Sequence, residues 1–279
     1  PAAGDAGGAI GAALAIWHLH HNKPRNNSPF LDSMKGAYLG PSFTNDEIER
    51  QLNLEGAVFK KLDPNELINQ VVKALNNENA VGWMQGKMEF GPRALGSRSI
   101  LADPRSKNMQ KQLNLKVKYR ESFRPFAPSI LNEDVSYWFD HNYTSPYMLF
   151  VAPVREDKRV KMSKKEANLF GIDKLNVPRS TVPAITHVDY SARIQTVHNE
   201  TNPRYYALIS KFKEETGCPM LVNTSFNVRG EPIVCSPSDA FKCFMGTEIE
   251  VLVIDNYILY KDEQNLALIQ DYKDQYELD

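Results

Sequence analysis

The sequence predicts an α/β fold, because stretches with a strand pattern alternate with stretches that have a helical pattern. Residues 80–84 and 219–223 are short apolar runs of the kind that form buried strands. Residues 63–75 instead place apolar side chains at helical spacing, after Asp63 as a helix cap and Pro64 in the first turn. With 279 residues, of which 42% are hydrophobic and 24% charged, the chain can form one large or two smaller globular domains.

The other elements follow from the same patterns. Thr44 or Asn45 can cap a helix, Ser236 can cap another, and Gly217 is a typical helix stop. The charged stretch 157–179 predicts a surface insertion. We predict helices over 8–20, 46–53, 63–75, 106–115, 202–217 and 236–245, and strands over 80–84, 126–131, 147–154, 193–197, 219–223, 251–254 and 257–260.

Composition narrows the class of protein. No apolar run approaches the roughly 20 residues that a membrane span needs, and no secretory signal pattern is present. The three cysteines, Cys218, Cys235 and Cys243, lack metal-ligand spacing and fit buried thiols in a reducing compartment. A formal net charge of −1 gives no reason to expect a nucleic-acid surface. We therefore expect a cytoplasmic protein without membrane or nucleic-acid partners.

The start of the chain resembles the interior of a domain. It has no methionine, and a loop of small residues runs directly into the helix predicted over 8–20. We therefore expect the chain to be the C-terminal piece of a longer protein.

The segment 84–131 is the main candidate for binding chemistry. It combines cations with glycines and prolines, although the whole chain is nearly neutral. Glycine lets main-chain N–H groups approach phosphate, and arginine and lysine neutralise it. The alternative is a solvated basic face with ordinary turns. The cations of this segment are Lys87, Arg93, Arg98, Arg105, Lys118, Arg120 and Arg124.

Two short patterns add to this segment. If residues 118–120 are extended, Lys118 and Arg120 lie on one face and can hold one phosphate. The run 223–227 follows an apolar strand, and open α/β sheets bind ligands where strands end. Ser225 and Asn227 there could bind phosphate or a carbonyl oxygen, or could form only a hydrogen-bonded turn.

Two further sites carry weaker signals. His187 and Asp189 could pair for acid–base work or bind substrate, or could belong to an ordinary surface loop. Asp5 stands in a loop at a helix start, where a carboxylate suits a metal or a ribose better than a phosphate. The chain shows no nucleophile elbow, Walker loop or zinc-protease motif, which favours positioning of charged substrates over covalent acyl-enzyme chemistry.

Several blocks resemble one known family. They are GDAGGAIGAAL (4–14), GKMEFGPRALGSRSILADPR (86–105), KYRESFRPFAPSI (118–130), HVDYSARIQTV (187–197) and PMLVNTSFNVRGEPIVCSPSDA (219–240). They closely resemble the carbamoyltransferases of the NodU, CmcH and TobZ type, in order and over nearly the whole chain.

The resemblance implies a fold in two parts. Residues 1–62 would be the C-terminal remnant of an actin-like ATPase-fold domain with its linker. Residues 63–279 would be a YrdC-like domain, a twisted mixed sheet with flanking helices.

The resemblance also implies a reaction. Carbamoyl phosphate and ATP, with Mg²⁺, would give carbamoyl-adenylate and pyrophosphate in the YrdC-like domain. The carbamoyl group would then pass to an acceptor hydroxyl in the actin-like domain, which holds an iron-type metal. A homodimer is also compatible with the family.

The family's K-x-R and S-x-N signatures match this chain at Lys118, Arg120, Ser225 and Asn227, which would be catalytic. Asp5 would be a metal ligand whose partners lie upstream of this chain. The expected substrate- and phosphate-binding residues are Lys87, Arg93, Arg98, Asn223, His187, Arg193 and Arg229.

Two other functions remain open at this stage. One is a threonylcarbamoyl-adenylate-type synthase for tRNA modification, and the other is a non-catalytic nucleotide- or RNA-binding module. The blocks 91–99 and 124–129 and the neutral charge count against them. One departure from the family is Tyr190, where glycine is usual, so the local loop is expected to differ because tyrosine adopts positive φ less readily.

Overall fold

The computed structural model describes residues 2, 4–25 and 32–269. Within them, an eight-stranded mixed sheet has the order β1-β10-β9-β2-β3-β8-β4-β7, and a two-stranded sheet pairs β5 with β6. The bounds are β1 Lys60–Lys61, β2 Val81–Met84, β3 Arg98–Ala102, β4 Ala127–Leu131, β5 Val151–Pro153, β6 Ser191–Arg193, β7 Gln195–Val197, β8 Met220–Ser225, β9 Val251–Ile254 and β10 Tyr257–Tyr260.

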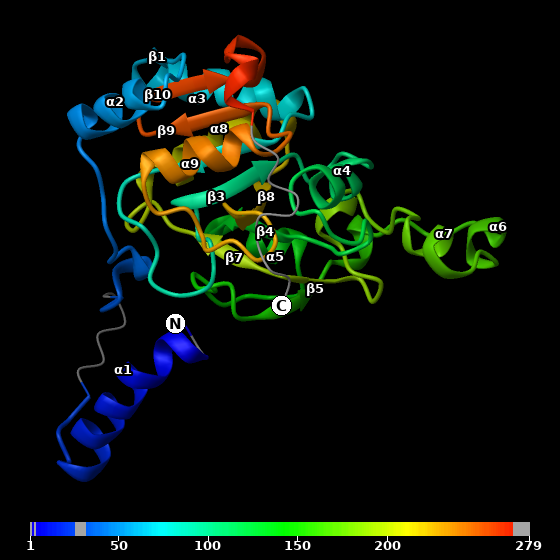
Figure 1. Ribbon diagram of the computed structural model, residues 1–279. Coiled ribbons are helices and arrows are strands. Elements are labelled where there is room, and N and C mark those ends of the chain that lie inside the picture. The colour runs from blue at the N-terminus through cyan, green and yellow to red at the C-terminus, as the bar shows by residue number, and fades with distance from the viewer. Residues whose placement is uncertain (1, 3, 26–31, 270–279) are drawn as a thin grey trace.

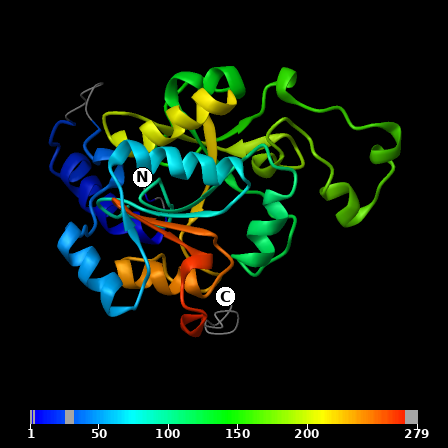
Figure 2. The same cartoon turned by 90° about the horizontal axis from the view of Figure 1, so that it is seen from above.

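Helices cover both faces of the large sheet (Figures 1 and 2). Two long helices, α3 and α8, pack against each other on one face, and α9 lies on the other face with α2 against it. The bounds are α1 Asp5–Ala15, α2 Asn45–Leu54, α3 Pro64–Asn76, α4 Met109–Lys116, α5 Val135–Trp138, α6 Lys164–Ala167, α7 Gly171–Leu175, α8 Pro203–Thr216 and α9 Pro237–Met245. The α/β class is therefore confirmed, and the finer YrdC-like and actin-like assignment stays a prediction.

The centre of the sheet joins strands that are far apart in sequence. Strand β3 pairs antiparallel with β8, so that Ser99 faces Ser225 and Leu101 faces Asn223. Strand β8 also pairs antiparallel with β4, whereas β2 runs parallel to β9 and β4 parallel to β7. The carboxyl end of β8 thereby lies between the start of β3 and the start of β4.

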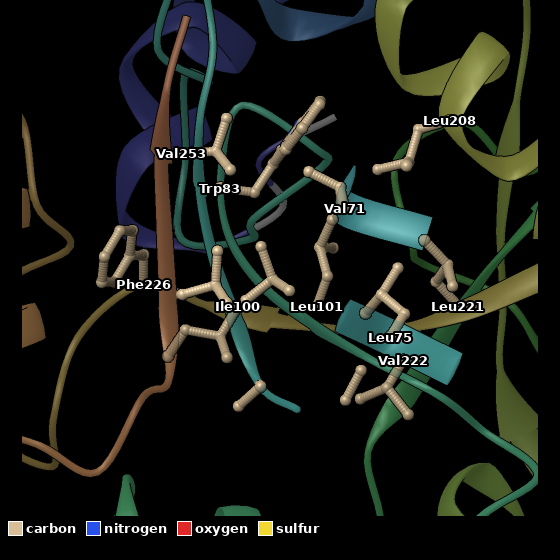
Figure 3. Close-up of a cluster of buried hydrophobic side chains, with 14 of the residues drawn as sticks. Val71, Leu75, Trp83, Ile100, Leu101, Leu208, Leu221, Val222, Phe226 and Val253 are labelled. Carbon is tan, nitrogen blue, oxygen red and sulfur yellow. The ribbon is translucent and has the colours of Figure 1, made fainter. Parts of the chain in front are cut away.

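The core fills the space between the helices and the sheet. Figure 3 shows side chains of α3 and α8 gathered with strand residues in one apolar cluster. Trp83 is fully buried and donates from Nε1 to the Gly96 carbonyl at 3.0 Å. Each large apolar side chain contributes about 1.5–3 kcal/mol when fully buried, so this cluster is the main support of the sheet. The labelled members are Val71, Leu75, Trp83, Ile100, Leu101, Leu208, Leu221, Val222, Phe226 and Val253.

The predicted helix ends are mostly confirmed. Thr44 and Glu47 form a capping box at α2, and the Asp63 carboxylate accepts from two backbone N–H groups at the start of α3. Ser236 forms a second capping box at α9. Gly217 ends α8 in the left-handed conformation, with φ of 74°. Local hydrogen-bonding chemistry decides these ends, which is why sequence patterns found them.

One predicted helix and two predicted strands need correction. The strand expected over 193–197 is divided between β6, Ser191–Arg193, and β7, Gln195–Val197, which belong to different sheets. Helix α1 begins at Asp5, three residues earlier than expected, and continues as a π-helix over Ile16–His20. The strand expected over 147–154 is confined to Val151–Pro153. Strand β3 was not predicted, because glycines and prolines before it masked a short run that is buried along its whole length.

The segment 157–179 projects from the body of the molecule as an arm (Figure 1). It contains the short helices α6 and α7, neither of which was predicted. Two backbone hydrogen bonds close its base, from Val160 N to Arg179 O at 2.8 Å and from Thr181 N to Lys158 O at 3.0 Å. The predicted surface insertion is therefore confirmed as a projection, with helical structure of its own.

The predicted domain boundary falls between β1 and α3. Strand β1 extends the large sheet through β10, and α2 packs on α9, so residues 45–61 lie against the same body as the sheet. Helix α1 stands apart from that body in Figure 1. Among the described residues, no helix has the length and apolar character that crossing a membrane requires.

Candidate functional site

A cavity of about 190 Å³ lies where β8 ends. Arg93 reaches it from the loop between β2 and β3, Arg120 from the turn after α4, and Arg193 from the end of β6. These residues are distant in sequence, and the pairing of β8 with β3 and β4 brings their segments together. The full lining is Pro92, Arg93, Ala94, Arg120, Pro125, Phe126, Ala127, Met148, Arg193, Asn223, Thr224 and Ser225.

The lining of this cavity is positively charged. Its lining contains three arginines and no aspartate or glutamate. Among the described residues, no carboxylate forms a salt bridge with Arg93, Arg120 or Arg193. Arg120 and Arg193 are half-buried, and Arg93 is exposed beside them. Proteins pair half-buried cations with anions, so arginines without a salt bridge at this cavity indicate a ligand with negative charge.

The electrostatic strain appears in the arginine pKa values. Burial, together with repulsion from Arg124 and Arg229, lowers the pKa of Arg120 to about 10, although the nearby Glu121 carboxylate acts in the opposite direction. Burial and the nearby Arg93 also lower the pKa of Arg193. The Nε atom of Arg193 is buried without a hydrogen-bond partner in the described residues. An anion in the cavity would relieve both the repulsion and this unmet donor.

Lys118 does not line this cavity, although it is two residues from Arg120. Its Nζ donates to the Ser225 carbonyl at 2.6 Å, the Asn227 carbonyl at 2.8 Å, Asn227 Oδ1 at 2.8 Å and Ser225 Oγ at 3.2 Å. Burial lowers the pKa of Lys118 to about 7. The Lys118 side chain therefore holds the S-x-N loop by hydrogen bonds on the side away from the cavity.

Residues 118–120 are not extended, so the condition under which Lys118 and Arg120 would share one face is not met. These residues form an irregular turn after α4, with Tyr119 at φ of 45°. Lys118 and Arg120 consequently point to different partners. Arg120 donates from Nε to Asn114 Oδ1 at 2.7 Å and lies over the ring of Phe126, which aims it at the cavity wall.

The S-x-N loop joins the cavity through Ser225. The Ser225 hydroxyl donates to Asn227 Oδ1 at 2.6 Å, and Asn227 Nδ2 donates to the Glu231 carbonyl at 2.6 Å. Ser225 lines the cavity and Asn227 does not. The loop is thus both a hydrogen-bonded turn and part of the cavity wall, so the two readings of this pattern are compatible.

Asn223 lines the cavity and belongs to a buried polar network. Its Nδ2 donates to the Ala94 carbonyl at 3.0 Å and lies 2.9 Å from both Ser129 Oγ and Gln195 Oε1. Ser129 donates to Gln195 Oε1 at 2.5 Å, and Gln195 Nε2 donates to the Leu95 carbonyl at 2.8 Å. Asn223 Oδ1 is buried and has no partner among the described residues.

The backbone N–H groups of the glycine-rich loop bind an anion that belongs to the protein itself. The buried Glu89 carboxylate accepts from the N–H groups of Leu95, Ser97 and Arg98 at 2.7, 2.7 and 3.1 Å. Gly96 allows this turn with φ of 103°, and the Tyr205 ring leaves no room there for a Cβ atom. These main-chain donors are therefore engaged by Glu89.

Arg98 is also engaged within the protein. Its guanidinium is fully buried and donates only to backbone carbonyls, which come from several segments. This side chain joins the loop before β3 to the neighbouring chain, and it does not line the arginine cavity. The accepting carbonyls are those of Pro41, Gln85, Gly86, Ser97 and Cys235.

The remaining predicted residues lie elsewhere. Lys87 lines a separate cavity of about 390 Å³, and His187 lines a third of about 250 Å³ beside the arm. Asp189 accepts from the N–H and the hydroxyl of Ser191, and burial lowers the pKa of His187. Arg229 is half-buried and acts on Arg120 through charge repulsion.

No metal centre is evident in the described part of the chain. No group of three or more histidine, cysteine, aspartate or glutamate side chains there is placed to hold a metal ion. The side chain of Asp5, the predicted metal ligand, lies outside what the structure describes.

Some residues of the site escaped the sequence patterns. Ser129, Gln195 and Asn114 are polar residues within or next to apolar runs, and Glu89 stands alone before the glycine-rich loop. In the sequence, such a residue can be recognised only as a polar side chain at a position where the surrounding apolar residues predict burial. Their partners come from distant segments, which a local pattern cannot supply.

Comparison with known proteins identifies the family. The family model for the carbamoyltransferase C-terminus matches residues 72–261. The chain is 40% identical over 266 residues to nodulation protein NolNO of Sinorhizobium fredii, covering 94% of this chain and 35% of that protein. It is 32% identical over 254 residues to 3'-hydroxymethylcephem-O-carbamoyltransferase of Streptomyces clavuligerus, covering 91% and 42%. The chain belongs to the carbamoyltransferase family, and the matched segment is the C-terminal part of such proteins.

An uncharacterized protein of Synechocystis sp. is 56% identical over 283 residues, covering all of this chain and 46% of that protein. The chain thus spans less than half the length of these relatives. The family resemblance predicted from the sequence blocks is confirmed, as is membership of a transferase family.

Proposed function

We propose that this chain carries the site where an ATP-dependent O-carbamoyltransferase activates carbamoyl phosphate as carbamoyl-adenylate, and that the arginine cavity at the end of β8 holds the anionic groups. The observation that carries the proposal is the group of three arginines in one cavity without an acidic partner in the described residues. The later transfer to an acceptor hydroxyl would use the longer protein.

In the proposed reaction, water first cleaves carbamoyl phosphate to carbamate and inorganic phosphate. A carbamate oxygen then forms a bond to the α-phosphorus of ATP, the bond to the β-phosphate oxygen breaks, and pyrophosphate leaves. No enzyme nucleophile is required, which agrees with the lack of a nucleophile motif in the sequence.

The main physical task of such a site is to hold two polyanions together. Their mutual repulsion opposes the approach of the reacting atoms, and fixed arginines can neutralise it and orient the phosphates. Arg93, Arg120 and Arg193 would contact the phosphoryl oxygens, with Mg²⁺ arriving on ATP. Guanidinium groups suit this task because they bind phosphate with two parallel hydrogen bonds.

We propose two roles for the predicted site residues, which their contacts support. We assign Ser225 to the cavity wall, where its oxygen faces the substrate. We assign Lys118 and Asn227 to positioning, since their hydrogen bonds fix the loop that carries Ser225. Arg98 would also be structural, because its donors are taken by carbonyls.

The direct test is exchange of labelled pyrophosphate into ATP, with and without carbamoyl phosphate. The proposal predicts exchange that depends on carbamoyl phosphate and is absent with bicarbonate plus threonine, the substrates of a threonylcarbamoyl-adenylate synthase. A double variant, Arg93→Gln with Arg193→Gln, should abolish this exchange while retaining the circular dichroism spectrum and unfolding temperature. Unchanged exchange in that variant would refute the assignment of the cavity.

A further inference from the structure

Two residues that line the cavity carry hydrogen-bonding atoms without partners in the described residues, one a donor and the other an acceptor. Asn223 is 1% exposed, lines the cavity, and carries an Oδ1 without a partner in the described residues. Arg193 lines the same cavity and carries an Nε in the same state. An isolated buried acceptor is costly, so it marks a place where a ligand or water completes the structure. A ligand that accepts a hydrogen bond from Arg193 Nε and donates one to Asn223 Oδ1 would satisfy both atoms.

The orientation of the Asn223 amide is fixed by its surroundings. Three acceptor atoms surround Nδ2, on Ala94, Ser129 and Gln195. The Ser129 proton is committed to Gln195 Oε1, and the Gln195 amide is held by the Leu95 carbonyl. A flipped Asn223 amide would set its oxygen against these acceptors, so Oδ1 must be the unmet atom.

We propose that Asn223 Oδ1 accepts a hydrogen bond from the carbamoyl NH₂ group and thereby selects a carbamoyl phosphate over an acyl phosphate of the same size and charge. Acetyl phosphate carries a methyl group in place of NH₂, which would leave Oδ1 buried and unmet. Phosphate oxygens at the other end of either ligand would meet the arginines. The inference rests on the proposed function, because it takes the cavity to be the carbamoyl phosphate site.

Selectivity for an NH₂ group over a methyl group arises when the polar side chains of a site are fixed in position. A site built to bond an N–H group rejects a ligand that lacks it, since the protein cannot otherwise satisfy its own buried atom. The buried Asn223, Ser129 and Gln195 side chains share one network, so Oδ1 cannot rotate to find another donor without breaking several bonds.

The first experiment measures binding of carbamoyl phosphate, acetyl phosphate and inorganic phosphate to the unaltered protein by competition with one labelled phosphate compound. We expect carbamoyl phosphate to bind about tenfold more tightly than acetyl phosphate, the effect of one buried hydrogen bond. Equal affinities would overturn the role of Asn223 and leave the proposed function standing. Failure of all three compounds to bind would instead overturn the proposed function.

The second experiment assigns the preference to the residue. In Asn223→Ala the ratio of the two affinities should fall to about one, while the surface variant Asn76→Ala should keep the original ratio. If Asn223→Ala does not fold, a crystal structure of the unaltered protein with carbamoyl phosphate decides. A carbamoyl nitrogen within hydrogen-bond distance of Asn223 Oδ1 supports the proposal, and a water on Oδ1 with the nitrogen elsewhere overturns it.

Discussion

At the scale of single residues, Lys118 and Arg120 of the K-x-R pattern have different surroundings. Arg120 reaches the cavity, whereas Lys118 is buried behind the S-x-N loop with four oxygen atoms around its Nζ. The sequence predicted both residues as partners of one phosphate. It could not show the positive φ of Tyr119, which turns the two side chains apart.

Arg193 gives the sharpest test of the charge in the cavity. Arg193→Met should weaken binding of carbamoyl phosphate roughly 10- to 100-fold, because a charged hydrogen bond contributes about 1.5–3 kcal/mol. Binding is measured by the same competition assay. Arg155→Met is the matched control, since Arg155 pairs with Asp157 on the surface and should leave affinity unchanged. Equal losses in both variants would point to general charge attraction.

The pKa of Lys118 predicts a pH effect on activity. Burial lowers this pKa from 10.5 to about 7, so Nζ loses its proton as the pH rises through 7. The neutral amine has two donors for four acceptors, and the loop that carries Ser225 should loosen. We expect kcat/KM for the exchange reaction, which reports the free enzyme, to fall above about pH 7. A flat profile from pH 6 to 9 would contradict this role of Lys118.

The same group should affect stability with the opposite sign. Because the unfolded lysine keeps its proton up to about pH 10, the unfolded state binds more protons than the folded state between pH 7 and 10. The contribution of Lys118 to the free energy of unfolding should therefore rise over this window. Urea unfolding of the unaltered protein and of Lys118→Met at pH 6 and 9 isolates this contribution.

At the scale of elements, the glycine-rich loop shows what a pattern can and cannot tell. Its composition indicated main-chain N–H groups gathered around an anion, and the structure shows that gathering. The anion in the structure is Glu89, and Arg98 is held by carbonyls rather than facing the cavity. A local sequence pattern can predict a group of main-chain N–H donors, but it does not show which anion they bind.

Loss of the Glu89 carboxylate should destabilise the protein strongly. Glu89→Ala would leave three buried N–H groups without their acceptor and should lower the free energy of unfolding by about 3 kcal/mol or more. Glu47→Ala removes an exposed carboxylate that also accepts from a backbone N–H group, and it should lower the free energy of unfolding much less. Urea unfolding measures both changes, and similar losses would argue against a special role for the loop.

Helices were better predicted than strands for a physical reason. A helix end is fixed by residues within one turn, as with Thr44 and Glu47 at α2. A strand such as β3 is fixed by its neighbours, and Ser99 meets its partner Ser225 only in the folded sheet. The arginine cavity depends on such strand pairings. Its residues could therefore be predicted as candidates from the sequence, but not that they line the same cavity.

At the scale of the whole molecule, the arm is separable from the body. Its helices α6 and α7 lie outside the main packing contacts between elements, and Phe170 is 92% exposed. Within residues 32–269, trypsin should cut first between Lys161 and Lys174, and mass spectrometry of the early fragments identifies the cut. The nicked protein should keep its unfolding temperature within about 2 °C. First cleavage within the sheet would contradict this view of the arm.

The pairing of β3 with β8 also has a consequence for folding kinetics. The cavity needs a loop from before β3, a turn after α4, the end of β6 and the end of β8. Contacts this distant in sequence form late, after the entropy of closing long loops has been overcome. A phosphate analogue that reports on the cavity would therefore respond only to chains that have completed the central sheet, which makes ligand binding a late marker of the native state.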